Sequence, residues 1–486
     1  MRNIFKDKMI SNSIVYIGSN LILKAFNFLL LPLYTAYLST SDYGITNLVT
    51  KFQNVAGYII ACCLQVAAIR FYSEYKSDRE KVKRLFGTII SFTFLSGICF
   101  LLLCIAFNKI LISLVFSGIV FWPTIFMSVV ALIFITTLTI FQEIMKGMQK
   151  AKVVAIASFA YFFIQLGLNI VTVVIMKLGA NGVIASSIVS NFIVSFAMLA
   201  YLIKERLFIP CIDKEMLRAT LKYSLPLLPH NVAASVSQLV SNVFINKFAS
   251  LSSVGIFALA SQFGSIAEMV ESSSNTAFQP WFYDEMNNKK NGYIRQIRQK
   301  SNLLVWFYGF VLIGLCFFSK EAVYLFCDQS YNQAWTVVPL IVMVYVANIP
   351  YFFFVNILFY FKKGTKYVFF ATLPASIINI ILSYFLIQKF DMYGSVMSDI
   401  IFVVIKMIII YYLSKKFDTD TLKMKDYILK IIFILIIASM GMIPSYVVFG
   451  NKFSVIETVI KGGILVLYVG FAVVISRKRI SKIGDR

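Results

Sequence analysis

Long apolar runs separated by short polar segments recur along the whole chain. About fourteen of them are roughly 18–25 residues long, which is enough to cross about 30 Å of hydrocarbon as a helix. The predicted spans are residues 13–37, 43–71, 85–107, 119–141, 153–176, 183–203, 223–248, 254–278, 303–326, 335–361, 369–387, 392–413, 428–449 and 455–475. The alternating pattern of transmembrane strands is absent. We therefore expect an all-α, polytopic membrane protein.

Part of the sequence of the first helical hairpin is repeated later in the chain. Tyr43-Gly44-Ile45 aligns with Val254-Gly255-Ile256, and Gly44 and Gly255 are 211 positions apart. At the same offset, Phe71-Tyr72-Ser73-Glu74 aligns with Phe282-Tyr283-Asp284-Glu285. Such internal repeats are typical of transporters. The prediction is an amino-terminal lobe of six helices (1–210), a second lobe of six helices (211–420), and two additional helices with a basic tail (421–486).

Composition supports a membrane location. The chain of 486 residues is 59% hydrophobic with a mean hydropathy of +0.81, whereas soluble domains use about 45–50% apolar residues. The seven cysteines show no metal-ligand spacing. No phosphate-binding G-x-x-x-x-G-K-[ST] sequence occurs either. We expect no metal and no cofactor.

The net charge of +23 is distributed unevenly. Basic residues collect at the amino end, at the carboxyl tail and in every second loop, around Lys81, Lys214, Lys290 and Lys416, while each intervening loop holds one lysine. By the positive-inside rule, the termini and the basic loops are cytoplasmic. This distribution favours membrane topology over a nucleic-acid partner as the reason for the charge.

Two lysines lie at the middle of the first predicted hairpin. Lys24 is about 11 residues into the first span, roughly 16 Å deep at about 1.5 Å per residue, and Lys51 is roughly 12 Å into the second. A lysine at a helix centre costs about 2.5–3.5 kcal/mol, so it normally faces water, an opposite charge or a substrate. Two cations without a carboxylate in one hairpin indicate an anionic ligand. The alternative is that either lysine pairs with a carboxylate on another helix.

Three further charged residues are candidates. Arg70, at the end of the second span, is either a third substrate-binding cation or an interface anchor. Glu268, taken as deeper than Glu271 in the eighth span, could carry a coupling proton or ion, or neutralise a lysine. Asp399 is a second coupling candidate, or the structural partner of Lys406 two turns away on the same face.

The opening hairpin resembles a known family. Phe28-Leu-Leu-Leu-Pro32-Leu followed by Tyr34-Thr-Ala-Tyr-Leu-Ser-Thr-Ser-Asp-Tyr-Gly44 is similar to the start of bacterial polysaccharide-biosynthesis flippases, which handle O-antigen or capsule repeat units. These belong to the multidrug/oligosaccharidyl-lipid/polysaccharide exporter superfamily. Arg70-Phe71-Tyr72, Tyr223-Ser-Leu-Pro226 and Val254-Gly-Ile-Phe257 are further matches.

The resemblance implies a substrate and a setting. The substrate would be a sugar repeat unit on undecaprenyl diphosphate, moved from the cytoplasmic to the external leaflet of the bacterial inner membrane by alternating access. It also implies two six-helix lobes, a cationic cavity that suits a diphosphate, and two extra helices. Candidate partners are the polymerase and the chain-length regulator of the same pathway, with H⁺ or Na⁺ as a candidate coupling ion.

Two other functions remain open from the sequence. A cation or drug antiporter of the same superfamily would need acidic cavity walls, and the lysines count against it. An integral-membrane polysaccharide polymerase or glycosyltransferase would need positioned acid and base residues, usually on a large external loop. The external turns offer little besides Asp42, Asp328 and Asp391. We expect a transporter and not an enzyme.

Overall fold

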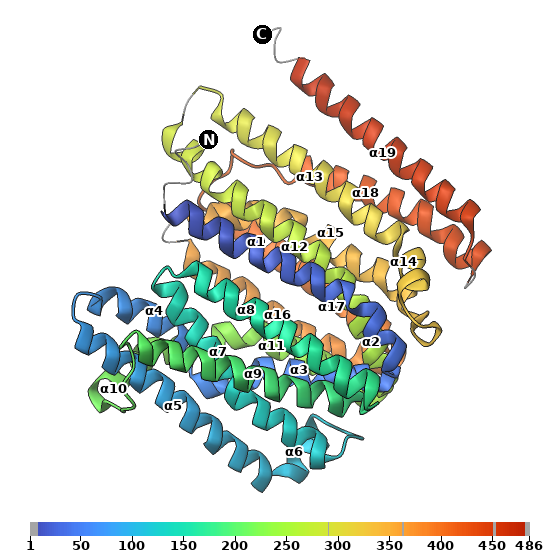
Figure 1. Cartoon of the computed structure of the whole chain (residues 1–486). Helices are drawn as coiled ribbons and strands as arrows, with labels where there is room; N and C mark the ends of the chain where they lie inside the picture. Colours follow the sequence, from blue (N-terminus) through green and yellow to red (C-terminus); the bar gives the residue numbers. More distant parts are fainter. Residues whose placement is uncertain (1–7, 290, 362–363, 451–452, 482–486) are drawn as a thin grey trace. The chain divides into compact units, whose positions relative to one another are not determined.

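The computed structural model describes residues 8–289, 291–361, 364–450 and 453–481, and this part of the chain contains helices and no strands (Figure 1). Its internal contacts group into two compact units, Met1–Gly255 and Ile256–Arg486. The first unit therefore includes the start of the predicted second lobe, and its boundary falls inside one long helix. The lobe boundary at residue 210 stays a prediction.

The first unit contains both short and long helices. They are α1 (Lys8–Leu29), α2 (Leu31–Tyr37), α3 (Thr40–Ala61), α4 (Leu64–Tyr75), α5 (Arg79–Ala106), α6 (Asn108–Leu114), η2 (Phe121–Ile125), α7 (Phe126–Gly147), α8 (Ala151–Asn169), η3 (Ile170–Ile175), α9 (Gly179–Lys204), α10 (Lys214–Ser224), η4 (Leu225–Leu227) and α11 (Leu228–Phe248). Helix α12 (Leu251–Asn288) crosses the boundary between the units.

The second unit continues with the same kind of element. Its helices are α13 (Tyr293–Phe317), α14 (Ser319–Phe326), η5 (Gln329–Tyr331), α15 (Ala334–Tyr360), α16 (Thr365–Phe390), α17 (Met392–Lys415), α18 (Lys425–Pro444), η6 (Ser445–Phe449) and α19 (Val455–Ser481).

The predicted all-α membrane fold is confirmed, whereas the predicted count of fourteen spans is not. Within the described ranges, eleven helices are long and apolar enough to cross a membrane, or twelve if the bent pair α3 and α4 is one span. The other two predicted spans correspond to α1 with α2 and to α11. Helix α11 contains polar residues on nearly every turn, including Asn231, Gln238, Asn242 and Asn246. Its composition therefore does not by itself identify a membrane span.

Large apolar side chains cover the outer faces of these helices. Ile156 on α8, Phe196 on α9, Phe385 on α16 and Leu467 on α19 are each more than 60% exposed. Contiguous exposed apolar surface of this kind marks a membrane-facing region. The chain is a multi-pass membrane protein.

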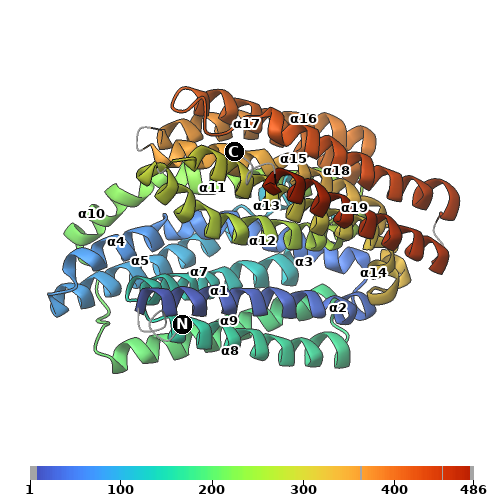
Figure 2. The same cartoon turned by 90° about the horizontal axis from the view of Figure 1, so that it is seen from above.

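Helix α7 is central to the first unit. It packs against α9, α5, α4 and α3, and its Leu132, Phe141 and Met145 are almost completely buried. Helix α1 lies alongside α8 (Figure 2), where the rings of Phe26 and Phe162 stack with their centroids 5.3 Å apart.

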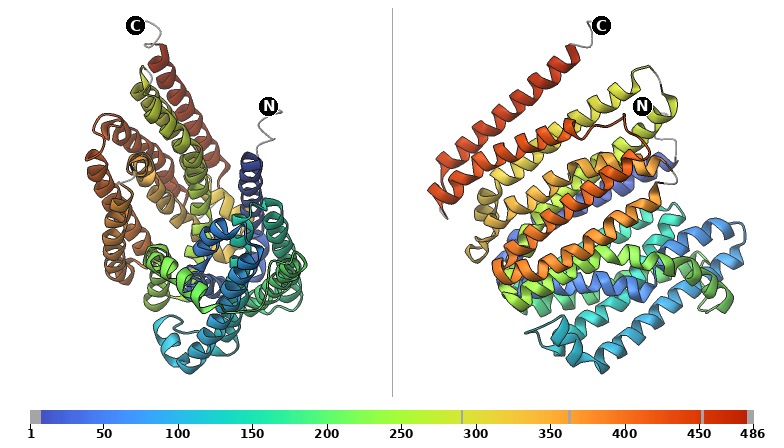
Figure 3. Two further views of the ribbon diagram at one scale, coloured as in Figure 1. Left: turned by 90° about the vertical axis from the view of Figure 1, so that its left-hand side faces the viewer. Right: turned by 180° about the vertical axis from the view of Figure 1, so that it is seen from behind.

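Helix α15 has the equivalent place in the second unit. It packs against α17, α13, α18 and α14, and α16 packs along α17. Helices α18 and α19 lie side by side and both contact α13 (Figure 3). Helices α7 and α15 correspond to the fourth spans of the two predicted repeats, residues 119–141 and 335–361.

Candidate functional site

Lys24 lies on the side of α1 that faces away from α8. It is exposed, and it is two residues before Phe26, which stacks on α8. Two residues correspond to about 200° around a helix, which sets the two side chains on opposite faces. Among the residues that the structure describes, none accepts a hydrogen bond from Lys24 or forms an ion pair with it. The first unit therefore presents a cation near the middle of the stretch formed by α1 and α2.

Lys51 is held between α3 and α11. Its Nζ donates a hydrogen bond of 2.9 Å to Oε1 of Gln238. Leu48 and Phe52 on either side of it are buried in a cluster that includes Leu239. The amide of Gln238 orients the ammonium group but does not cancel its charge.

The polar turn between α2 and α3 fixes the start of the helix that carries Lys51. Ser39 Oγ accepts from the backbone N–H of Asp42 at 3.1 Å, and the backbone N–H of Ser39 donates to Oδ2 of Asp42 at 3.3 Å. This reciprocal pair is a capping box. Oδ1 of Asp42 also accepts from the backbone N–H of Ala180 at 3.1 Å, in the first turn of α9. One carboxylate thus caps two helices.

Arg70 does not join the two lysines. It is exposed on α4, beyond the αL residues Cys62 and Cys63 at which the α3–α4 pair bends by 43°. No ion pair involves Arg70 within the described ranges. Its environment fits the interface anchor as well as a substrate contact, so its binding role stays a prediction.

The second unit contains a buried polar cluster at α12, α15 and α17. Glu271 is 1% exposed, and its Oε2 accepts from Nδ2 of Asn348 at 3.4 Å. Oε1 of Glu271 and Oδ1 of Asn348 have no hydrogen-bond partner in the described part of the chain. Two neighbouring acceptor oxygens without a donor are suited to a proton or a small cation, because a buried acceptor without a partner costs about 1–3 kcal/mol.

Charged side chains surround this carboxylate. Glu268, one turn earlier, interacts electrostatically with Glu271, and so does Lys406 on α17. Lys406 lies over the ring of Tyr351, with its Nζ 4.1 Å from the centroid. Asp399 accepts from Nδ2 of Asn379 at 3.0 Å.

The buried glutamate of this cluster is not the one that the sequence predicted. Glu271 is the buried carboxylate of α12, whereas Glu268, taken as the deeper one from the sequence, is exposed. The sequence does contain the signal: Ala260, Gly264, Ala267 and Glu271 recur at three- and four-residue spacing and are all buried. The coupling roles of Glu268 and Asp399 stay predictions.

The chain is similar to proteins of known class. Residues 9–286 match the family described as "Polysaccharide biosynthesis protein". "Lsg locus putative protein 1" of Haemophilus influenzae (strain ATCC 51907 / DSM 11121 / KW20 / Rd) is 22% identical over 388 residues, which cover 74% of this chain and 86% of that protein.

Solved structures share its fold. A structure described as "Lipid II flippase MurJ, inward closed conformation" has a TM-score of 0.73 at 18% identity and covers 97% of this chain and 100% of its own. An inward-facing multidrug resistance MATE family transporter of the MOP superfamily has a TM-score of 0.64 at 12% identity, covering 81% of this chain and 94% of its own.

The family match extends over more than half of the chain and includes α1, α3 and α11, the helices that position Lys24 and Lys51. Together with the helical fold and the apolar outer faces, it identifies the class of the protein. The chain belongs to the polysaccharide biosynthesis protein family of multi-pass membrane proteins.

Proposed function

We propose that the protein is a flippase that moves an undecaprenyl-diphosphate-linked oligosaccharide repeat unit from the cytoplasmic to the external leaflet by alternating access. The observation that carries this proposal is Lys24, an exposed cation near the middle of an apolar segment, without an acceptor among the described residues. Membership of the polysaccharide biosynthesis family supports the glycan, and the similarity to a protein named lipid II flippase supports a lipid carrier.

The chemistry of the substrate explains the need for such cations. A diphosphate must carry at least two negative charges through a region whose helices are otherwise apolar. A charge-assisted hydrogen bond to a fixed ammonium group in a partly dry site contributes about 1.5–3 kcal/mol. The charge of Lys24 is not neutralised by any carboxylate in the part of the chain that the structure describes. Lys51 supplies an ammonium group whose position is set by Gln238.

We assign the coupling of transport to H⁺ or Na⁺ to the cluster around Glu271. The unpartnered oxygens of Glu271 and Asn348 would take a proton or Na⁺, and Glu268 and Asp399 would tune its affinity as nearby negative charges. The same carboxylate favours a second candidate function, a cation antiporter, because a buried acidic group is what a cationic cargo requires. Export of a cationic drug that depends on Glu271 would support that alternative.

The setting follows from the charge distribution. We place both termini and the basic loops in the cytoplasm and the protein in the bacterial inner membrane, because basic residues collect in those segments. The polymerase and the chain-length regulator of the same glycan remain proposed partners.

The decisive experiment combines glycan export with protein abundance. Lys24→Ala and Lys51→Ala should each lower export by about ten- to a hundredfold at unchanged membrane abundance, since about 1.4 kcal/mol is tenfold. Lys24→Arg should keep part of the activity and Lys24→Glu should be worse than Ala, because it adds repulsion. Lys109→Ala, at an exposed position on α6, is the matched control. Normal export by Lys24→Glu at normal abundance would overturn the proposal.

A further inference from the structure

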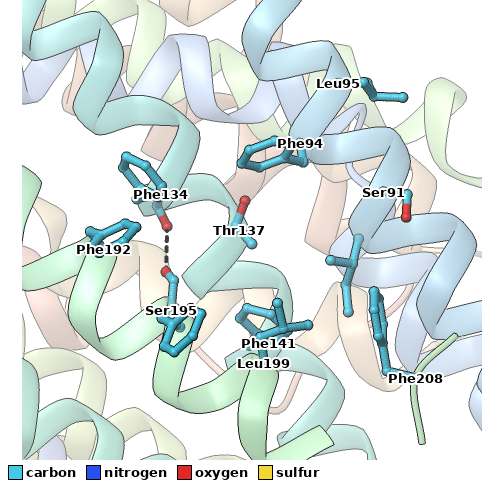
Figure 4. Close-up of a pocket in the computed structure, with 12 residues that line it drawn as sticks. Ser91, Phe94, Leu95, Phe134, Thr137, Phe141, Phe192, Ser195, Leu199 and Phe208 are labelled. Carbon is cyan, nitrogen blue, oxygen red and sulfur yellow. Dashed lines mark hydrogen bonds between the residues drawn. The ribbon is translucent and has the colours of Figure 1, made fainter. Parts of the chain in front are cut away.

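A groove of about 480 Å³ lies among α5, α7 and α9 in the first unit (Figure 4). Half of the twelve residues that line it are phenylalanines: Phe94, Phe134, Phe141, Phe192, Phe196 and Phe208. None of the residues discussed as substrate or coupling sites lines it. The groove is therefore separate from the site already described.

The groove opens toward the surrounding membrane. All three helices are apolar enough to span a bilayer. Its floor is buried, with Ile90 5% and Phe141 1% exposed, whereas its rim is open, with Leu95 52% and Phe196 65% exposed. An unfilled groove would forfeit dispersion contacts along its wall, so an apolar chain from the bilayer is the fitting occupant.

Two of the three hydroxyl groups in the wall, those of Thr137 and Ser195, make no demand for a polar ligand. Oγ1 of Thr137 donates to the carbonyl oxygen of Ile133 at 2.7 Å, and Oγ of Ser195 donates to the carbonyl oxygen of Phe134 at 3.1 Å. Both donors are satisfied within the protein. A sugar placed here would find few hydrogen-bond partners and would lose its hydration.

A basic side chain, Arg84, lies on α5 beyond one end of the groove. The segment after α9 contains Phe208, which lines the groove, and Ile209, whose carbonyl oxygen lies directly against α5 at Gly87. Arg84 is on the same helix, six residues before Ile90, or about 9 Å along the axis. Its side chain is 63% exposed, and its Nη1 is 4.0 Å from Oδ2 of Asp213.

We propose that this groove binds an acyl chain of an anionic glycerophospholipid, with the lipid phosphate at Arg84. The apolar wall takes the chain, and the exposed guanidinium group lies at the end where a head group would emerge. Basic pockets beside membrane helices bind anionic lipid head groups in this way. A single, partly engaged arginine matches one phosphate better than a diphosphate, which favours a bilayer lipid over the polyprenyl carrier.

Photolabelling of the full-length protein tests the site. The protein is placed in nanodiscs of phosphatidylglycerol and phosphatidylcholine with a trace of phosphatidylglycerol that carries a diazirine in one acyl chain, and labelled peptides are mapped by mass spectrometry. Labelling should concentrate on α5, α7 and α9. Ser91→Trp, which fills the groove, should reduce it about tenfold, a change that corresponds to about 1.4 kcal/mol. Ile156→Trp on α8, also lipid-exposed but outside the groove, should leave it unchanged.

The head-group contact has its own variants. Arg84→Gln should lower the preference for phosphatidylglycerol over phosphatidylcholine about fivefold, as expected for one basic residue near the membrane surface, and Arg84→Lys should preserve it. Phe196→Ala, a change at the rim that adds no bulk, should weaken labelling even if Ser91→Trp fails to fold. Equal labelling of all lipid-facing helices would overturn the proposal. So would displacement of the label by undecaprenyl phosphate but not by unlabelled phosphatidylglycerol.

Discussion

Gly44 and Gly255, which are equivalent in the predicted repeat, lie against each other. A Cβ added to Gly44 would be 3.1 Å from the backbone nitrogen of Gly255, and one added to Gly255 would be 3.0 Å from the nitrogen of Gly44. Each would also collide with a carbonyl oxygen of the opposite segment, that of Leu251 or Thr40. Oγ1 of Thr40 and Oγ of Ser252 are hydrogen-bonded beside this contact at 2.8 Å.

Alanine at either glycine should separate the two helix starts. We expect Gly44→Ala and Gly255→Ala each to destabilise the protein by about 1–3 kcal/mol, the usual cost of overpacking, and to lower the thermal unfolding temperature in detergent. Gly167→Ala on α8 is the control, because nothing lies within 4 Å of its added Cβ. A Gly44→Ala protein as stable as Gly167→Ala would contradict the close approach.

Asp42 should be the most sensitive residue of the first polar turn. Asp42→Ala removes the acceptor oxygens for the backbone N–H groups of Ser39 and Ala180, and each such capping bond contributes about 1 kcal/mol. Asp42→Asn should lose about half as much stability, because its single amide oxygen can replace only one of the two acceptor oxygens. Ser41→Ala, in the same turn, should have little effect on the unfolding temperature. Equal effects of Asp42→Ala and Ser41→Ala would show that the double cap contributes nothing.

Helix α19 is attached to α14 by a buried ion network. Nζ of Lys320 is 2.7 Å from Oε2 of Glu457, and Nζ of Lys461 is 2.7 Å from Oε1 of Glu457 and 3.0 Å from Oε1 of Glu321. The side chains of Lys320, Glu457 and Lys461 are only 1–2% exposed. This network was not predicted from the sequence.

Removal of one carboxylate should loosen this attachment. Glu457→Gln leaves two buried ammonium groups with one carboxylate, and breaking a buried pair in this way costs about 3–5 kcal/mol. Faster proteolysis or hydrogen exchange of α19 is the expected result. The double change Lys320→Met with Glu457→Gln removes one charge of each sign and should recover part of the loss. No recovery would mean that charge balance is not what stabilises this contact.

Glu271 should determine any proton or sodium dependence of transport. Because Glu271 is buried beside an unpartnered oxygen of Asn348, Glu271→Gln should remove the response to a pH or sodium gradient in vesicles. The exposed Glu268 should matter less, so Glu268→Gln should reduce the response without removing it. An unchanged gradient response of Glu271→Gln would assign this carboxylate a structural role, balanced by Lys406.

The hydropathy pattern determined the fold class and most of the helices. A bilayer demands about 20 apolar residues per span, so span positions are a local property that can be read residue by residue. The same logic identified Lys24, because a cation within an apolar run is costly wherever the helix packs. The turn at residues 39–42 was recognisable as polar. The hydrogen bond from this turn to Ala180 could not be predicted from the sequence.

Contacts between distant segments were decided only in the tertiary structure. Lys51 meets Gln238 across 187 positions, and Glu271 rather than Glu268 is buried because α15 and α17 cover that side of α12. In helices that are apolar all round, composition does not say which face meets a neighbour and which meets lipid. The same ambiguity hid the phenylalanine groove and the burial of Lys320. The burial and pairing of a side chain depend on which helices pack together. That arrangement is determined by side-chain packing between segments that are far apart in the sequence.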